Sequence, residues 1–422
     1  MPAKDIISFY GNTAEGVITP PPSKSHTHRA FFLSSMSSEG CKISNSLNSH
    51  DTISTLNAAE AIGAEVKRYC GNVKIVNTNL HVPSDIVDCG NSGTTMRLFT
   101  GMASMFDSPV TITGDASLRS RPMGELLDAL TTMNVKCSSA EGKAPVTVCG
   151  PNNGGKVSIR GNVSSQFISS LMIVAPMLSR DTDIKIEGNL LSRPYVDITA
   201  SMMKLFGASV DMNENDIHIQ GRTGYKGCDI TIPSDLSSAA FPLVAGALNG
   251  CVKVKNIDMN DPQGDKRIVN ILADAGTCVS VNGKEVTSSS RELNAIDVNM
   301  NDIPDLFPIV AVLLSTAKGR SRLYGAPQLR FKESDRIGST VKMLSSLGAD
   351  IEGTDDGCII NGVKRLRGGM IEHNEDHRIF MAAAVASLLC DGAVTMKSSK
   401  CYSISYPLFV EHMKRLGVNA EV

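Results

Sequence analysis

A pattern of about 70 residues recurs six times along the chain, and this period limits the folds open to it. Six apolar segments that read as helices each begin with small polar or charged residues, and their aligned positions stand 67 to 73 residues apart. These positions are Ser25, Ser92, Ser165, Ser238, Asp305 and His377. Units of this length are too long for a thin solenoid and too alike for unrelated domains. We therefore predict that the 422 residues form six similar α+β units.

A second mark keeps the same period. In each unit, Gly or Asn follows another helix-like segment: Gly63, Asn134, Gly207, Gly276, Gly348 and Gly417. A helix commonly ends at a residue in the left-handed conformation, which Gly adopts without strain and Asn tolerates better than most residues. Alternating stretches such as 157–159 and 252–254 read as half-buried strands. Each unit is thus predicted to hold two helices and at least two strands.

The six units are expected to form two lobes of three units each. The Pro-rich residues 19–22 and the Gly-rich stretch 221–229 contain residues that interrupt helices and strands, and their hydrophobic periodicity is weak. They are therefore the expected hinges. Lobe I would then join residues 1–19 to residues 229–422, and lobe II would be residues 20–228.

The composition is that of an ordinary globular protein. Lys plus Arg number 41 against 43 Asp plus Glu, so nothing in the overall charge attracts nucleic acid or an anionic membrane. The apolar runs are far shorter than the roughly 20 residues that cross a bilayer, and no targeting segment is visible. We expect a cytoplasmic monomer with small-molecule substrates and neither a nucleic-acid nor a membrane partner.

Metal and nucleotide signatures are missing from the sequence. The 11 cysteines include no C-x-x-C pair, and no other residue completes a metal set around His373 and His377. The chain has neither a G-x-G-x-x-G nor a P-loop motif. We therefore expect no metal and no cofactor.

Cations and small residues gather at the predicted helix starts. Unpaired N–H groups and the helix dipole make such ends favourable to anions, and similar units would aim several of them toward one place. The first three starts and the loops of later units supply Lys24, Arg29, Gly93, Arg97, Arg121, Lys332, Arg336, Arg378 and Lys400. The sequence thus indicates a site for phosphate and carboxylate groups.

Nine short motifs occur in order between residue 22 and about residue 410. They are P-S-K-S-x-x-x-R from Pro22, N-S-G-T-x-x-R from Asn91, R-P-M from Arg121, V-S-S-Q-F from Val163, S-R-P-Y-x-D-I-T from Ser192, I-P-D from Ile303, R-x-K-E-S-D-R from Arg330, D-H-R from Asp376 and K-C from Lys400. Together they resemble the 5-enolpyruvylshikimate-3-phosphate (EPSP) synthases of the enolpyruvyl transferase family. The resemblance implies a two-lobed α+β (α/β) fold, an inside-out α/β barrel with three βαβαββ repeats in each lobe.

The resemblance also implies a reaction. A member of this family transfers the enolpyruvyl group of phosphoenolpyruvate to the 5-hydroxyl of shikimate 3-phosphate and releases phosphate. The step belongs to the shikimate pathway, which leads to chorismate and the aromatic amino acids. Both substrates carry a phosphate and a carboxylate, so a concentrated set of cations suits the reaction.

The motifs carry the family's site residues onto this chain. By resemblance, the shikimate 3-phosphate contacts are Lys24, Ser25, Arg29, Ser164, Ser165, Gln166, Ser192, Tyr195, Asp305, Gln328 and Lys332. The phosphoenolpyruvate contacts are Lys24, Gly93, Arg97, Arg121, Gln166, Arg336, Arg378 and Lys400. Two proton-transfer groups are needed: Asp305 is the expected base at the hydroxyl, and Glu333 the expected group at the methylene carbon, with Lys24 as the alternative.

Other interpretations stay open at this point. Asp305 follows Pro304 and could simply cap a helix. Gln328 stands where family members often have Asn. A related enzyme transfers enolpyruvate to UDP-N-acetylglucosamine, although its usual K-N-A opening and reactive loop Cys do not occur here. A non-catalytic or RNA-end-processing relative of the same fold is the alternative from another class.

Overall fold

The computed structural model describes residues 6–69 and 71–421. The chain folds into two compact units: unit 1 joins the residues up to Pro21 with those from Pro233 onward, and unit 2 runs from Pro22 to Ile232. The predicted lobe boundaries lie within a few residues of these points.

The described part of unit 2 contains three four-stranded sheets. Their strand orders are β14 (Ile230–Thr231), β3 (Cys41–Ser44), β5 (Asn72–Thr78), β4 (Ala64–Tyr69); β6 (Val87–Asp88), β7 (Val110–Thr113), β9 (Lys143–Cys149), β8 (Lys136–Ala140); and β10 (Gly155–Arg160), β11 (Thr182–Glu187), β13 (Asp216–Ile219), β12 (Val210–Met212). The helices are α1 (Lys24–Ser35), α2 (His50–Ala61), α3 (Gly93–Ala103), α4 (Ala116–Arg119), α5 (Gly124–Thr132), α6 (Ser165–Val174) and α7 (Arg193–Leu205).

Unit 1, within residues 6–21 and 233–421, also contains three four-stranded sheets. Their orders are β16 (Cys278–Asn282), β17 (Glu285–Ser289), β15 (Gly250–Lys255), β2 (Ala14–Ile18); β18 (Asp297–Asn299), β19 (Arg320–Tyr324), β21 (Gly357–Asn361), β20 (Asp350–Thr354); and β22 (Gly369–Ile371), β23 (Val394–Lys397), β1 (Ile6–Tyr10), β24 (Asn419–Glu421). The helices are α8 (Leu236–Asn249), α9 (Ile268–Asp274), α10 (Phe307–Leu314), α11 (Arg336–Ser346), α12 (His377–Ala386) and α13 (Phe409–Arg415). Short 3-10 helices at Gly264–Arg267 (η2), Pro304–Leu306 (η3), Pro327–Phe331 (η4) and Cys401–Ile404 (η6) carry several polar residues discussed below.

All six described sheets share one pairing pattern. Each combines one parallel pair with two antiparallel pairs, as in β10–β11, β11–β13 and β13–β12. The parallel pair needs a crossover connection, and a helix such as α6 between β10 and β11 supplies it. The predicted six βαβαββ repeats, three in each unit, are confirmed.

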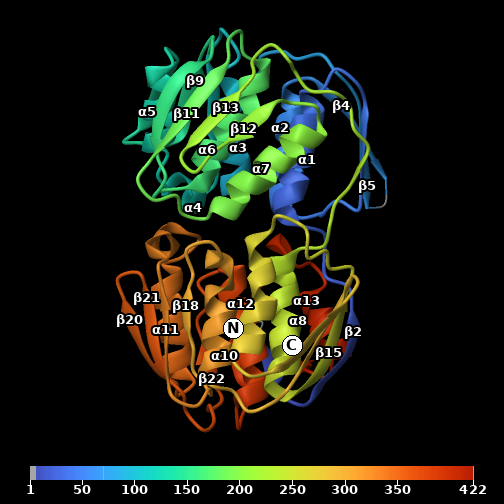
Figure 1. The fold of residues 1–422 in the computed structure, drawn as a ribbon, viewed down its shortest axis with the longest axis vertical. Coiled ribbons are helices and arrows are strands. Elements are labelled where there is room, and N and C mark those ends of the chain that lie inside the picture. Colours follow the sequence, from blue (N-terminus) through green and yellow to red (C-terminus); the bar gives the residue numbers. More distant parts are fainter. Residues whose placement is uncertain (1–5, 70, 422) are drawn as a thin grey trace, which may run out of the picture. The chain divides into compact units, whose positions relative to one another are not determined.

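Strands from distant parts of the chain complete some of these sheets. β1 pairs with β23 and β24, and β2 pairs in parallel with β15, beside which it lies in Figure 1. The N-terminal segment therefore belongs to unit 1 because two of that unit's sheets need it. β14 likewise pairs with β3 and keeps the chain in unit 2 as far as Ile232.

The Gly-rich stretch predicted as a hinge is anchored within unit 2. The Tyr225 hydroxyl donates to the Ile173 carbonyl over 2.7 Å, and the Lys226 N–H donates to the Phe206 carbonyl over 2.9 Å. The passage between the units comes a few residues later, at Ile232–Pro233.

The helices form the inside of each unit. Every residue of α10 and α12 is buried, which suits their nearly continuous apolar sequences. Strands such as β10 alternate between buried and exposed residues, so each sheet presents one face to the helices and the other to solvent. This is the expected inside-out arrangement. Within the described ranges, every helix is too short or too polar to serve as a membrane span.

The predicted helix ends are confirmed by the backbone. Each of the six residues at the second mark has a positive φ: Gly63 101°, Asn134 65°, Gly207 84°, Gly276 94°, Gly348 85° and Gly417 96°. The sequence period thus records a conformational requirement repeated in all six units.

Candidate active site

Three helices of unit 2 begin at the predicted positions, each with a serine N-cap. Ser23 accepts from the His26 N–H, Ser92 from the Thr95 N–H and Ser164 from the Gln166 N–H. These bonds satisfy N–H groups that the helix itself leaves unpaired. Lys24, Gly93 and Ser165 are therefore the first residues of α1, α3 and α6.

Gly93 lies beside two guanidinium groups. A Cβ atom at this position would stand 3.0 Å from Arg121 Nη1 and 3.8 Å from Arg97 Nη1. Arg121 is 8% exposed, and its Nη2 donates to Asn91 Oδ1 over 2.7 Å. The absence of a side chain at Gly93 thus leaves room for a small anion next to both cations.

Gln166 orients Arg97 in this cluster. Arg97 Nη1 donates to Gln166 Oε1 over 2.8 Å, and Gln166 Nε2 donates to Thr94 Oγ1 over 3.0 Å. The guanidinium of Arg97 also lies 5.5 Å from the centroid of the Phe167 ring. The structure therefore brings together Gly93, Arg97, Arg121 and Gln166, four of the residues predicted to contact phosphoenolpyruvate.

Lys24 is paired with an acid that the sequence analysis missed. Its Nζ lies 3.1 Å from Asp51 Oδ2, in the first turn of α2, and both side chains are largely buried. No motif or spacing marked Asp51.

Arg29 ties α1 to the other helices of unit 2 and is only 1% exposed. It donates to Thr199 Oγ1, Ser169 Oγ and the carbonyls of Ser25 and Tyr195 at 2.7 to 3.3 Å. Burial lowers its pKa to about 10, so the guanidinium is still charged at neutral pH. The backbone carbonyls of Ser25 and Tyr195 thus both accept from the Arg29 guanidinium.

The remaining serines predicted in unit 2 also lie at helix starts. Ser192 is the N-cap of α7, is 5% exposed and has a φ of 60°, which is uncommon for a residue with a side chain. Ser165 is also 5% exposed, whereas Ser164 is half-buried.

In unit 1, Asp305 joins two arginines. Arg336 Nη1 donates to Asp305 Oδ1 over 2.9 Å, and Arg378 Nη2 donates to Asp305 Oδ2 over 3.1 Å. Asp305 is the second residue of η3, whose N-cap is Ile303, and Leu306 is the N-cap of α10, so Asp305 is the N-cap residue of neither helix. Arg336 also donates to Glu333 Oε2 over 2.6 Å and to Asp376 Oδ2 over 3.0 Å.

These pairs set the ionisation of the cluster. Burial alone would raise the pKa of Asp305, but Arg378, Arg336 and Lys332 together hold that pKa well below its usual range. Burial likewise opposes the charge on Arg336, yet Asp376, Glu333 and Asp305 raise the pKa of its guanidinium. At neutral pH, Asp305 is therefore a carboxylate facing two charged arginines.

Two other predicted residues of unit 1 lie on η4 or at its end. Gln328 is 6% exposed, and its Nε2 donates to the Asn301 carbonyl over 3.3 Å. Lys332 ends η4, is half-buried and is close enough to Asp305 to lower its pKa. The predicted Lys400 comes just before η6 and is exposed, unlike Arg336 and Arg378.

Asp265, which the sequence analysis did not single out, is a further acid near this cluster. It lies in η2, is 4% exposed and accepts from Ser237 Oγ. Burial, together with the negative charge of Asp305, raises its pKa to about 7. Asp265 thus holds its proton far more readily than Asp305 does.

Other polar clusters offer weaker sites. His373, Glu375 and Cys401 place possible metal-ligand atoms within 4.8 Å of one another. However, His373 Nδ1 accepts from the Glu375 N–H over 3.1 Å, and burial raises the pKa of Cys401 to about 12, so neither ligand atom is readily available. His377 begins α12 while His373 precedes it, so the two imidazoles do not share a helix face.

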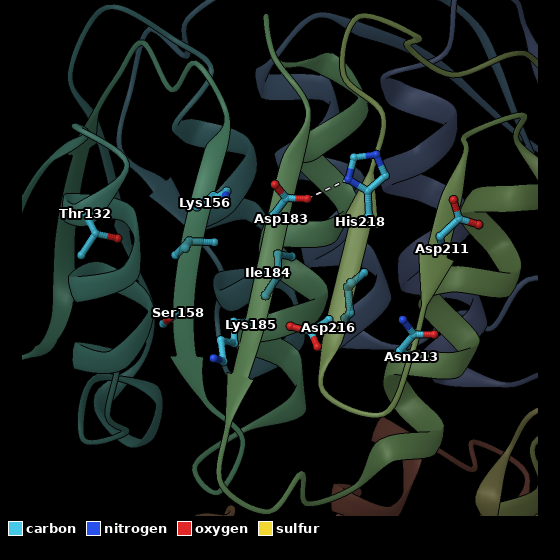
Figure 2. A pocket seen from close by; sticks show the side chains of 12 residues that line it. Thr132, Lys156, Ser158, Asp183, Ile184, Lys185, Asp211, Asn213, Asp216 and His218 are labelled. Atoms are coloured by element: carbon cyan, nitrogen blue, oxygen red, sulfur yellow. Dashed lines mark hydrogen bonds and ion pairs between the residues drawn. The ribbon is translucent and has the colours of Figure 1, made fainter.

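A groove also lies on the outer face of sheet β10–β13, where His218 Nδ1 stands 2.7 Å from Asp183 Oδ1 (Figure 2). Lys156, Lys185 and Asp211 also line this groove, and none of the residues predicted for the active site does. Its mixed charges on an open sheet face give it no preference for an anion.

Comparison with known proteins agrees with the geometry. A sequence model of the family described as EPSP synthase (3-phosphoshikimate 1-carboxyvinyltransferase) matches residues 10–413. The chain is 47% identical over 407 residues to the 3-phosphoshikimate 1-carboxyvinyltransferase of Methanocorpusculum labreanum, covering 96% of both chains. It is 39% identical over 416 residues to the protein of that name from Methanocaldococcus jannaschii, covering 97% of both.

Solved structures give the same result. The chain is similar to the EPSP synthase of Acinetobacter baumannii with a TM-score of 0.82, 28% identity and 99% coverage of both chains. It also shares its fold with the enolpyruvyl transferase NikO from Streptomyces tendae, at a TM-score of 0.79 and 16% identity, covering 99% of this chain and 98% of the other.

Proposed function

The chain belongs to the EPSP synthase (3-phosphoshikimate 1-carboxyvinyltransferase) family, and we propose that it transfers the enolpyruvyl group of phosphoenolpyruvate to the 5-hydroxyl of shikimate 3-phosphate. Phosphate is the second product. The observation that carries the assignment of residues is the Asp305 carboxylate held by Arg336 and Arg378, because it combines a proton acceptor with two anion-binding groups.

The arginines have two proposed tasks. Arg121 and Arg97 beside Gly93, and Arg336 and Arg378 beside Asp305, bind the phosphate and carboxylate of phosphoenolpyruvate. A guanidinium holds such groups with two parallel hydrogen bonds, which fixes the orientation as well as the charge. Lys24 and Lys400 add point charges. We assign to shikimate 3-phosphate the predicted serines, Arg29, Tyr195, Asp305, Gln328 and Lys332. Lys24 and Gln166 are assigned to both substrates.

Asp305 is the proposed base. Among Arg378, Arg336 and Lys332 alone, the low pKa of Asp305 makes it a weak proton acceptor. A phosphoenolpyruvate anion that bonds to Arg336 and Arg378 competes with Asp305 for their N–H groups and adds negative charge, so the pKa of Asp305 rises. Substrate binding thus makes Asp305 basic when the hydroxyl is in place.

The reaction then proceeds in two balanced steps. First, the 5-hydroxyl proton passes to Asp305, the oxygen bonds to C2 of phosphoenolpyruvate, and C3 gains a proton from Glu333 or Lys24. Second, C3 returns a proton to the group that supplied it, the double bond between C2 and C3 re-forms, and the bond from C2 to the phosphate oxygen breaks as phosphate leaves with the proton that Asp305 had taken. Lys24 Nζ carries a proton while it donates to Asp51 Oδ2 over 3.1 Å, whereas Glu333 Oε2 accepts from Arg336 Nη2 over 2.6 Å and has to be protonated before it can serve as the donor.

Phosphate release from phosphoenolpyruvate tests the function. We expect release with shikimate 3-phosphate and none with UDP-N-acetylglucosamine, because the family match favours the first acceptor. Release only with the sugar nucleotide would assign the chain to the related transfer. Binding of both substrates without release would support a non-catalytic role.

Replacing the base tests its role separately. Asp305→Ala should lower kcat by about 10² to 10⁴-fold, the usual contribution of a positioned acid or base. Its affinity for shikimate 3-phosphate, measured by calorimetry, should change far less. Retained turnover would refute the role of Asp305 without touching the reaction assigned to the chain.

Two further points are part of the proposal. We propose that the enzyme acts on its small substrates as a monomer, which sedimentation at several concentrations checks. The cytoplasmic location stays a prediction, which fractionation of the source cells would check.

A further inference from the structure

A chain of buried side-chain hydrogen bonds crosses three helices of unit 2. His28 Nδ1 on α1 lies 2.5 Å from Thr55 Oγ1 on α2, and Thr55 Oγ1 lies 2.7 Å from Thr95 Oγ1 on α3. Thr95 Oγ1 lies in turn 2.6 Å from Ser92 Oγ, the N-cap of α3. All four side chains are fully buried, with no measurable exposure. This chain therefore ends at the residue that precedes Gly93.

The series of hydrogen bonds from His28 to Ser92 runs beside the Lys24–Asp51 ion pair. Lys24 and His28 are four residues apart on α1, and Asp51 and Thr55 are four residues apart on α2, so each helix presents both members of its pair on one face. The ion pair and the His28–Thr55 contact are thus two successive links between the same two helices. The Asp51 carbonyl also accepts from Thr95 Oγ1 over 3.3 Å, which joins the first link to α3.

The direction of these hydrogen bonds follows from counting hydroxyl protons. Each hydroxyl donates once. If His28 Nδ1–H donates to Thr55, Thr55 donates to Thr95, and Thr95 donates to the Asp51 carbonyl, then every proton has an acceptor. The reverse direction would leave His28 Nε2–H buried, where no acceptor lies within reach among the described residues. A buried N–H without a partner costs more than an unused acceptor, so the Nδ1–H tautomer is favoured.

Charge excludes a role for His28 in proton transfer near neutral pH. Burial, and then the positive charges of Lys24 and Arg29, hold the pKa of His28 well below its usual value. The imidazole stays neutral, which is the form that the hydrogen-bond chain requires.

We propose that neutral His28 is a positioning residue that sets the start of α3, and hence Gly93, relative to Lys24 through Thr55 and Thr95. This inference rests on the proposed function, in which Lys24 and Gly93 contact phosphoenolpyruvate. It does not give His28 a contact with either substrate. Loss of these hydrogen bonds is expected to weaken phosphoenolpyruvate binding and to leave shikimate 3-phosphate binding unchanged.

Steady-state kinetics of four variants test the proposal. His28→Leu and Thr55→Val break the chain, and each should raise KM for phosphoenolpyruvate about tenfold, which corresponds to the loss of one buried hydrogen bond. His28→Asn keeps an N–H donor near the position of Nδ1 and should stay within about twofold of wild type. The double variant should be no worse than either single change, since both break one chain.

Thr100→Val is the matched control. Thr100 is also fully buried on α3, but its hydroxyl donates only to the Met96 carbonyl of its own helix. This variant should leave both KM values unchanged. His28→Asn should also keep the wild-type pH profile of kcat/KM, whereas a histidine that transfers a proton would change it.

The outcomes separate the two proposals. If wild type releases no phosphate, the proposed function fails and this inference fails with it. If wild type is active but Thr55→Val leaves KM for phosphoenolpyruvate unchanged, raises both KM values equally or behaves like Thr100→Val, only the positioning role is overturned. Should His28→Leu fail to fold, Thr55→Val and His28→Asn still decide the result.

Discussion

Replacing Gly93 with Ala should separate substrate binding from stability. The added methyl carbon would stand 3.0 Å from Arg121 Nη1, closer than ordinary van der Waals contact. An anion oxygen held by Arg121 needs an N–O distance of about 2.7–2.9 Å, so the methyl group competes for the same space. We expect the loss of about one charge-assisted hydrogen bond, about 1.5–3 kcal/mol. KM for phosphoenolpyruvate should then rise about 10- to 150-fold.

The fold should tolerate this change. Gly93 begins α3 and is not among the residues with positive φ. Ala in a helix is more favourable than Gly by up to about 1 kcal/mol, so Tm should stay the same or rise slightly. Gly124→Ala is the matched control, because Gly124 begins α5 and a Cβ atom there meets nothing within 4 Å.

Phosphate-release kinetics at varied concentrations of each substrate provide the assay. We expect KM for shikimate 3-phosphate to change less than about threefold in Gly93→Ala, and neither KM to change in the control. An unchanged KM for phosphoenolpyruvate would refute the reasoning. An equal rise in both KM values, or a marked fall in Tm, would show instead that the methyl group disturbs the unit as a whole.

Three further predictions concern stability. Arg336→Met should lower the free energy of unfolding by about 3–5 kcal/mol in urea titrations, because it leaves the fully buried Asp376 without its cation. The control Arg330→Met removes one member of an exposed ion pair and should lower the free energy of unfolding by less than about 1 kcal/mol. Equal losses in the two variants would contradict this prediction. Asp265→Asn removes a carboxyl group whose pKa rises to about 7 on folding. Because of this group, the folded wild-type protein binds more protons than the unfolded wild-type protein between pH about 4 and about 7. The stability of wild type relative to this variant should therefore fall as pH rises through that range, and a parallel pH dependence in thermal melts would exclude the shift. Gly207→Ala, at a φ of 84°, should cost about 1–2 kcal/mol in the same titrations, while a neutral effect would argue against the strained helix end.

Local rules account for what the sequence predicted well. The helix ends at Gly207 and Asn134 require a residue in the left-handed conformation, independently of the rest of the fold. The regular spacing of these Gly and Asn residues therefore reveals the structural repeat. Helix starts at Ser23 and Ser92 follow from capping, which also depends only on neighbouring residues.

Long-range pairing explains what the sequence could not provide. β14 is only two residues long and has no periodicity of its own, yet its pairing with β3 decides where unit 2 ends. The acidic partners of the predicted cations could not be identified from the sequence either. Asp51 meets Lys24 only because α2 packs on α1, and Asp265 comes near Asp305 through tertiary packing that neither spacing nor motif recorded.

The most direct test of the central claim is the identity of the products. Incubation of the protein with phosphoenolpyruvate and shikimate 3-phosphate, followed by ³¹P NMR and mass spectrometry, should show one phosphate formed for each carboxyvinyl ether of shikimate 3-phosphate. Pyruvate and phosphate with unchanged shikimate 3-phosphate would contradict group transfer, and unchanged phosphoenolpyruvate would contradict the whole account.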